Sequence, residues 1–260
     1  MEEKLKQLRQ YNQSKENAER IKPYVQMAEK FALLAMQYAD AFEELYAKVQ
    51  QEACRTEYAK GGQMIHRGFY SPSCLDVITG GFNRGRLLKR LPSKGSYDYT
   101  YTFDAQGKMI CCKHHGSVEI LIHNENCILG LEFNQRGSHF PERISECWYE
   151  DTKLVKYVCA LLNSYDKVAC CSEINVETFD YADDLLEKFN WYRFSPAIKS
   201  LSHNEITLFR DNAGNLLEYT DVARDLPPFL EAPSIPARRY TAKKKEKLFH
   251  DSSNLALFQF

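Results

Sequence analysis

Two cysteines and two histidines crowd into residues 111–115, which read Cys-Cys-Lys-His-His. Both residue types bind transition metals, and a thiol beside an imidazole can also act as a nucleophile. On an extended strand, successive side chains point to opposite faces, so Cys112 and His114 would share one face. Cys111 and His115 would share the other. No Cys-x-x-Cys pair occurs to complete a tetrahedral zinc site. We therefore expect no metal and no cofactor, with Cys112 and His114 as the alternative metal ligands.

Other catalytic signatures are missing from the sequence. It contains no Gly-x-Ser-x-Gly elbow of a serine hydrolase and no Gly-Lys-Ser/Thr phosphate loop. The glycine-rich stretch 80–86 therefore predicts tight turns rather than a nucleotide cradle. We expect a protein that is not an enzyme. A metal-dependent hydrolase or nuclease built on residues 111–115 is the alternative.

The composition is that of a folded protein without a dominating charge. The 260 residues are 44% hydrophobic and 13% aromatic, enough to bury a core, and their formal net charge is −1. No global field therefore attracts the chain to nucleic acid or to an anionic membrane. The start is charged, no apolar run is long enough to span a bilayer, and the nine cysteines are an odd number. We expect reduced thiols and a cytoplasmic protein.

Residues 1–58 are expected to be helical. Between residues 24 and 49, apolar side chains recur at steps of three and four, the pattern of one buried helical face. Pro23 is expected to open this helix, because its missing N–H is not needed in the first turn. The stripe predicts packing of the helix onto the body of the protein. A structural oligomer, most simply a homodimeric coiled coil through residues 24–54, is the alternative. The stripe consists of Met27, Phe31, Leu34, Tyr38, Phe42, Leu45 and Val49.

From residue 96 to residue 222 the sequence alternates between short β-rich runs and turn residues. Asn, Asp and Gly mark the turns, and each pair of runs predicts a β-hairpin. Five successive hairpins predict a large antiparallel β-meander of about ten strands. The fold class is therefore α+β, with an N-terminal helical segment followed by the meander. The predicted strand pairs are 97–103 with 108–114, 117–123 with 127–133, 144–149 with 154–161, 167–179 with 185–194, and 205–209 with 216–220.

Two further segments flank the meander. Residues 59–95 form a glycine-rich connection, and residues 223–260 form a proline-spaced, basic arm that is expected to wrap around the body. The basic residues of this arm have one aromatic residue, Tyr240, among them. They would give only salt-sensitive binding to nucleic acid. A solvated arm is therefore expected.

One hairpin carries a distinctive turn pattern. Residues 101–109 read Tyr-Thr-Phe-Asp-Ala-Gln-Gly-Lys-Met, in which Asp104 can accept turn N–H groups and Gly107 can adopt a left-handed conformation. This stretch resembles the tyrosine–aspartate repeat of Rhs-type polymorphic toxins. The meander as a whole resembles the small β-meander immunity proteins encoded beside such toxins. The resemblance implies a cytoplasmic protein that binds and neutralises a cognate toxin or another effector.

Aromatic residues and acidic turns of the meander supply the candidate binding surface. Tyr and Trp dominate binding hot spots, and carboxylates at the turns could meet a basic partner such as the groove of a nuclease toxin. We therefore expect a non-catalytic protein-binding protein whose partner is another protein, not a membrane or nucleic acid. The candidate partner surface comprises Tyr97, Tyr99, Tyr101, Trp148, Tyr149, Glu150, Asp151, Asp183, Asp184, Trp191 and Tyr192.

Overall fold

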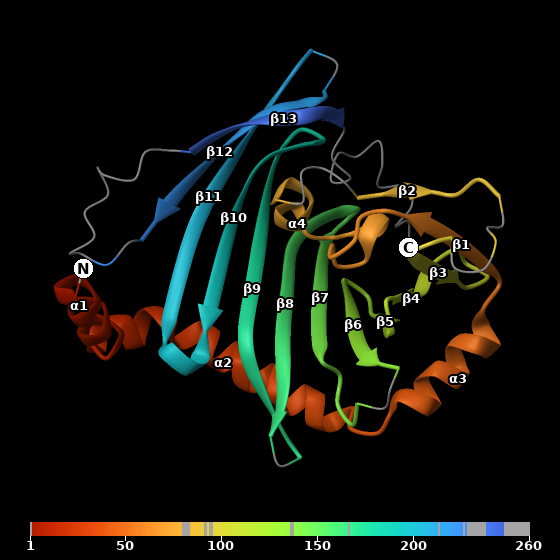
Figure 1. Cartoon of the computed structure of the whole chain (residues 1–260), viewed down its shortest axis with the longest axis horizontal. Coiled ribbons are helices and arrows are strands. Elements are labelled where there is room, and N and C mark those ends of the chain that lie inside the picture. The colour runs from red at the N-terminus through yellow and green to blue at the C-terminus, as the bar shows by residue number, and fades with distance from the viewer. Residues whose placement is uncertain are drawn as a thin grey trace.

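The computed structural model consists of N-terminal helices and one large antiparallel sheet (Figure 1). It describes residues 2–79, 84–90, 93, 96–135, 138–165, 167–212, 214–225 and 227, and the backbone of 238–246. Within these residues, no helix is both long enough and apolar enough to cross a membrane. The helices are α1 (Glu2–Asn12), α2 (Lys15–Gln37), α3 (Phe42–Glu52), α4 (Cys74–Thr79) and the short 3-10 turns η1 (Gly68–Tyr70) and η2 (Pro196–Ile198). The strands are β1 (Arg55–Lys60), β2 (Arg86–Leu87), β3 (Tyr99–Phe103), β4 (Met109–His114), β5 (Ser117–His123), β6 (Cys127–Asn134), β7 (Arg143–Glu150), β8 (Lys153–Tyr165), β9 (Val168–Ala182), β10 (Leu185–Ser195), β11 (Ser200–Arg210), β12 (Leu216–Arg224) and β13 (Arg238–Glu246).

The predicted α+β class, with helices first and an antiparallel meander after them, is confirmed. The sheet has the order β13-β12-β11-β10-β9-β8-β7-β6-β5-β4-β3-β1-β2, so β3 to β12 are the ten strands of the five predicted hairpins in chain order. The turn pattern also works as predicted in the first hairpin. Asp104 Oδ1 accepts the backbone N–H groups of Gln106 at 3.0 Å and Lys108 at 2.8 Å, and Gly107 has a φ of 82°.

Helix α2 begins earlier than predicted. Ser14 caps it, and the Ser14 hydroxyl accepts a hydrogen bond from the backbone N–H of Asn17 at 3.1 Å. Pro23 therefore lies inside the helix, and the prediction that it opens the helix is wrong. Ser14, rather than Pro23, marks the start of the helix.

The predicted continuous helix over residues 24–49 is also wrong, because α2 ends at Gln37 and α3 follows after a turn. Asp40 takes a positive φ of 57° in this turn, and its backbone N–H donates to the carbonyl of His139 at 2.8 Å. A contact with the β6–β7 loop thus redirects the chain. The apolar stripe itself packs on the sheet, where Phe31 is fully buried, so the face that a coiled coil would need is covered by the chain itself.

Three strands lie outside the predicted hairpins: β1, β2 and β13. Strand β1 overlaps the end of the segment 1–58 that we expected to be helical, and it pairs with β3 from Arg55↔Phe103 to Ala59↔Tyr99. Its sequence lacks a clear apolar alternation, so the pairing with β3 decides its conformation. Strand β13 places part of the predicted arm at one edge of the sheet, beside β12. Residues 228–237 and 247–260 of the arm, and 80–83 of the predicted tight turns, lie outside the described residues.

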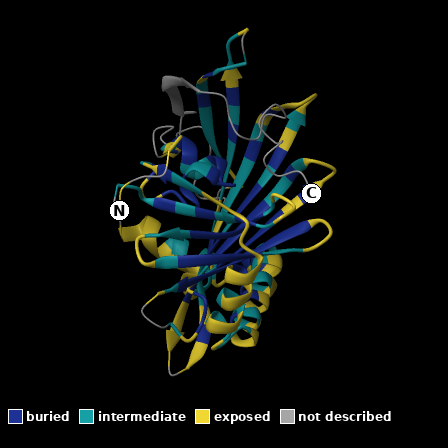
Figure 2. Cartoon of the chain, turned by 90° about the vertical axis from the view of Figure 1, so that its right-hand side faces the viewer, coloured by how far each residue is buried: buried dark blue, intermediate teal, exposed yellow. Residues whose placement is uncertain are grey.

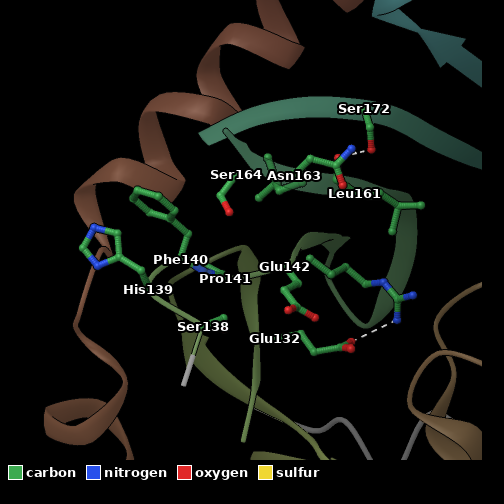
Figure 3. Close-up of a pocket in the computed structure, with 12 residues that line it drawn as sticks. Glu132, Ser138, His139, Phe140, Pro141, Glu142, Leu161, Asn163, Ser164 and Ser172 are labelled. Carbon is green, nitrogen blue, oxygen red and sulfur yellow. Dashed lines mark hydrogen bonds and ion pairs between the residues drawn. The ribbon is translucent and has the colours of Figure 1, made fainter. Parts of the chain in front are cut away.

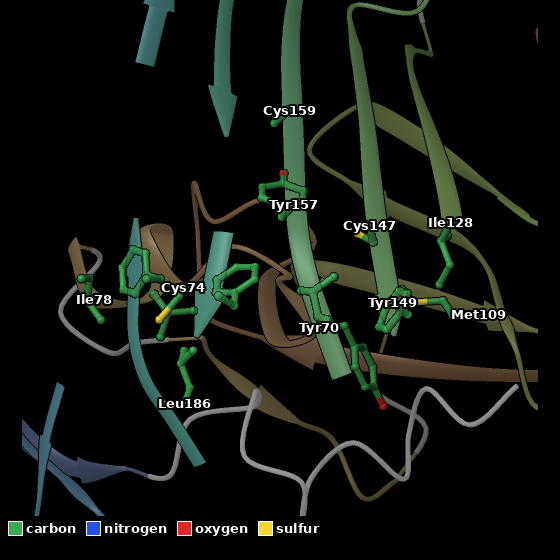
Figure 4. Close-up of a cluster of buried hydrophobic side chains, with 14 of the residues drawn as sticks. Tyr70, Cys74, Ile78, Met109, Ile128, Cys147, Tyr149, Tyr157, Cys159 and Leu186 are labelled. Atoms are coloured by element: carbon green, nitrogen blue, oxygen red, sulfur yellow. The ribbon is translucent and has the colours of Figure 1, made fainter. Parts of the chain in front are cut away.

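The sheet separates two apolar cores. Helices α2 and α3 cover one face of the sheet, which we call the helix face (Figure 1). Residues 61–79, which include α4, cover the other face, which we call the inner face. The strand centres are buried, whereas the outer sides of the helices are exposed (Figure 2). On the inner face, Cys74 and Ile78 of α4 point towards the sheet, near Leu186 of β10 (Figure 4). Charged groups buried on this face therefore need partners within the protein.

Candidate functional sites

Strand β4 carries the cysteine–histidine segment, and its two cysteines point to opposite faces as expected. Cys111 lies in the core of the helix face and Cys112 in that of the inner face, and both are fully buried. Burial raises the pKa of the Cys111 thiol to about 12 and raises that of Cys112 well above its usual range. Both are protonated thiols at neutral pH, so neither offers a ready thiolate for nucleophilic catalysis.

The strand register sets a row of charged residues on the inner face. Glu119 of β5 lies opposite Glu132 of β6, and Glu132 lies opposite Arg143 of β7. Both carboxyl groups are buried, and Arg143 Nη1 donates to Glu132 Oε2 at 2.9 Å. Burial alone would raise the pKa of Glu132, but His114 and Arg143 outweigh it and hold the pKa below its usual value. The row therefore consists of ionised, paired groups.

Arg67 reaches this row from the segment between β1 and α4. Its side chain is 2% exposed, and its backbone has a positive φ of 58°. Nε and Nη2 donate to the two carboxylate oxygens of Glu119 at 2.8 and 2.7 Å, and Nη2 also donates to Ser145 Oγ at 2.8 Å. Burial alone would raise the pKa of Glu119, but Arg67 and His66 outweigh it and hold the pKa well below its usual range. Arg67 and Glu119 form a bidentate ion pair in the core.

His66 lies between the two carboxylates. Its Nδ1 is 2.6 Å from the hydroxyl of Tyr157, and its Nε2 is 3.1 Å from Glu119 Oε2 and 3.8 Å from Glu132 Oε2. In the described part of the chain, the potential ligand atoms of these three residues all lie within 4.8 Å of one another. Cys112 is outside this group. His114 Nε2 lies 3.7 Å from Glu132 Oε1, but among the described residues Cys112 and His114 do not belong to a cluster of three potential ligands.

Two hollows reach the charged row, and Arg143 lines both. One, of about 350 Å³, is lined by His66, Tyr157 and Trp191 among others. The other, of about 860 Å³, opens beside Glu132 between the β6–β7 loop and the end of β8 (Figure 3). Small solutes can therefore approach the row from two sides.

Another buried carboxyl group, outside the charged row, fixes α4 to the sheet. Glu177 of β9 accepts hydrogen bonds from the Ser73 hydroxyl and from the backbone N–H groups of Cys74 at 2.8 Å and Leu75 at 3.0 Å. Burial raises the pKa of Glu177 to about 8, against the effect of these donors. The side chain therefore carries a proton at neutral pH.

We predict that Glu177→Gln flattens the pH dependence of stability. A raised native pKa means that the folded protein holds a proton that the unfolded chain releases above about pH 4.5. The free energy of unfolding of the wild type should therefore fall as pH rises from about 5 to 8, and denaturation at several pH values measures it. Glutamine imitates the protonated acid and should remove part of this slope. Glu187→Gln, at an exposed site on the next strand, should follow the wild type; equal slopes in all three proteins would contradict the assignment.

Three aromatic residues expected on the partner surface are buried instead, so the prediction is wrong for Tyr99, Tyr101 and Tyr149. The hydroxyl of Tyr99 donates to the carbonyl of Gly62 at 2.7 Å, and that of Tyr101 donates to the carbonyl of Arg67 at 2.9 Å. Alternation correctly places Tyr99 and Tyr101 on one face of the strand. It does not reveal that residues 61–79 cover that face.

The other aromatic candidates do not share one surface. Trp148 is 39% exposed beside Glu146 on the helix face, whereas Trp191 is half-buried in the hollow of the inner face. Tyr192 packs against Tyr24 of α2, on the helix face, with ring centroids 5.8 Å apart. Tyr97, half-buried, packs against the Tyr58 ring of β1 at 4.8 Å. Together they cannot form a continuous aromatic patch.

The predicted acidic turns, by contrast, are brought together. An antiparallel meander places every second turn at the same end of the sheet, and the β7–β8 and β9–β10 turns lie at the upper edge in Figure 1. Lys153 connects them, because its Nζ lies 3.4 Å from Asp184 Oδ1 and also donates to the carbonyl of Asp183. The β5–β6 turn adjoins them through the N–H of Tyr149, which donates to the carbonyl of Asn126. We call the exposed carboxylates of these turns the acidic rim: Glu125, Glu150, Asp151, Asp183 and Asp184.

Sequence reasoning missed the charged row of the inner face. A signal exists for Glu119 and Glu132, because each is a single charge inside an apolar run. A charge at such a position needs a buried partner. His66 and Arg67 carry no such signal, since they lie in a segment without regular secondary structure.

No protein-family model matches this chain, and no curated protein is similar to it in sequence. The geometry of the site is therefore the basis for a functional proposal.

Proposed function

We propose that this chain is a non-catalytic, cytoplasmic protein-binding protein, an immunity-type inhibitor that covers a basic surface of a cognate toxin or effector. The acidic rim is the observation that supports this most. Its five carboxylates are exposed, whereas Asp104 and Asp211 of the outer turns at the same edge are occupied as acceptors of turn hydrogen bonds. All nine cysteines are free, which suits a reducing compartment.

Exposed apolar side chains accompany the rim. Leu185, Phe209 and Leu217 are each about 40% exposed, and they lie close to the β9–β10 and β11–β12 turns at the same end of the sheet. Carboxylates next to apolar side chains suit a basic protein surface, where charge directs the encounter and apolar contact adds affinity. The rival hydrolase would need a reactive group in β4, and the two cysteines there are buried thiols.

The rim can be neutralised without disturbing its turns. Asp151 and Asp183 have positive φ values of 54° and 51°, a conformation that asparagine tolerates. We predict that the variant Glu150→Gln/Asp151→Asn/Asp183→Asn/Asp184→Asn binds its partner on the order of tenfold more weakly, mainly through slower association. The partner to be tested is the protein encoded beside this chain in its source genome. Calorimetry at several salt concentrations measures the affinity, and co-expression measures the rescue of growth.

A matched control carries the same charge change on the helices, at exposed glutamates that become glutamine: Glu19, Glu29, Glu44 and Glu52. This control should bind as the wild type does. The proposal fails if the neighbouring protein is not bound, or if the rim variant and the helix control lose affinity equally.

A further inference from the structure

We propose that His66, Glu119 and Glu132 form a binding site for a divalent transition-metal ion, independent of the acidic rim. The ligand atoms converge on the inner face from the segment before η1 and from strands β5 and β6. His66 Nε2 lies 3.1 Å from the nearest oxygen of Glu119 and 3.8 Å from that of Glu132. Ligands held tetrahedrally about 2.1 Å from an ion lie about 3.4 Å apart. The measured separations bracket this value.

The imidazole of His66 points to the same conclusion. The side chain is 4% exposed, and within the described residues its Nε2 forms no well-directed hydrogen bond, although it lies 3.1 Å from Glu119 Oε2 and 3.8 Å from Glu132 Oε2. Its other nitrogen, Nδ1, is held by the hydroxyl of Tyr157 at 2.6 Å. Metal-binding histidines use their second nitrogen in this way, because the contact fixes the orientation of the ring.

Both carboxylates are oriented by groups around them. Arg67 and Ser145 hold Glu119, and Arg143 holds Glu132. The two guanidinium groups already balance the two carboxylates, so the network holds together without a cation. We therefore expect reversible binding, weaker than in structural zinc sites.

The donor set and the access route limit the choice of ion. One imidazole nitrogen and two carboxylate oxygens favour zinc, cobalt(II) or a similar transition metal over calcium or magnesium. Three protein ligands leave a fourth position open. The two hollows, one lined by His66 and the other by Glu132, connect the group to solvent.

Metal titration of the full chain, stripped with a chelator, tests the site. Calorimetry with zinc chloride and absorption spectroscopy with cobalt(II) chloride should each show one ion per chain. His66→Gln and Glu132→Gln should weaken binding at least about tenfold, and Tyr157→Phe about tenfold. Tyr157→Phe keeps the buried ring, so it reports on the site even if a ligand variant fails to fold. His139→Gln, at a histidine that is 42% exposed and lines the larger hollow, is the matched control and should bind normally.

Four results would overturn the inference, the last of them in the rim variant. The first is no binding of either ion to the wild type, and the second is unchanged binding in both His66→Gln and Tyr157→Phe. The third is a thiolate-to-cobalt charge-transfer band, which would place the ion on a cysteine such as Cys112. The four-residue rim variant should bind the metal as the wild type does, and loss of binding there would place the ion at the rim. Partner binding is measured separately, so either proposal can fail alone.

Discussion

Replacing Arg67 by methionine is expected to lower the free energy of unfolding by about 3–5 kcal/mol. The guanidinium group is buried and donates to both oxygens of Glu119, at 2.7 and 2.8 Å. Methionine has a similar length but leaves the Glu119 carboxylate in the core without its cation. Urea denaturation measures the loss as a lower midpoint with an unchanged slope.

Two further variants separate this ion pair from a general loss of packing. Arg193→Met removes a similar side chain that is 54% exposed and pairs with Glu173 at 2.5 Å, so it should cost less than about 1 kcal/mol. Glu119→Gln in the Arg67→Met background removes the unpaired charge and should restore part of the lost stability. If Arg67→Met and Arg193→Met lower the free energy of unfolding equally, burial does not make the Arg67–Glu119 pair more important than the exposed pair.

The five hairpins could be predicted because their signals are local. Each strand pair is joined by a few turn residues, and a residue such as Asp104 or Gly107 specifies its turn through contacts with its immediate neighbours. Strand β1 had no such signal, since its pairing partner β3 begins almost forty residues later in the sequence. The end of α2 was missed for the same reason, because a contact with His139 turns the chain at Asp40.

The charged row depends on contacts that no local pattern contains. Alternation places Glu119 and Glu132 on a face of their strands, but the register across β5, β6 and β7 decides that Glu119 lies opposite Glu132 and Glu132 opposite Arg143. The segment 61–79 then decides which face is covered. This explains why Tyr99 and Tyr101 were expected to be exposed, although they lie beneath that segment. The exposure of the acidic turn residues, by contrast, follows from local signals, and alternate turns must share one end of a meander.

Gly130→Ala is expected to lower the free energy of unfolding by about 3 kcal/mol, although it adds only one methyl group. Gly130 lies in β6, opposite Ser145 of β7. A Cβ at this position would lie 2.5 Å from Arg67 Nη2 and closer still to Glu119 Oε1 and Ser145 Oγ. The methyl group would have to push the buried ion pair apart, so thermal and urea denaturation should both show a large loss.

Two further variants test whether the ion pair causes the loss of stability in Gly130→Ala: Gly116→Ala, and Gly130→Ala in the Arg67→Met background. Gly116 has a φ of 89° in an open turn, where a Cβ would meet no atom within 4 Å among the described residues. Gly116→Ala should therefore cost about 1 kcal/mol from backbone strain alone. In the Arg67→Met background, Gly130→Ala should cost less than it does alone, because Glu119, the group closest to the added methyl, is no longer held by Arg67 and can move away. Additive losses would mean that Gly130 matters for another reason. A shared loss would show that glycine is required at 130 because the Arg67–Glu119 pair occupies the space of its side chain.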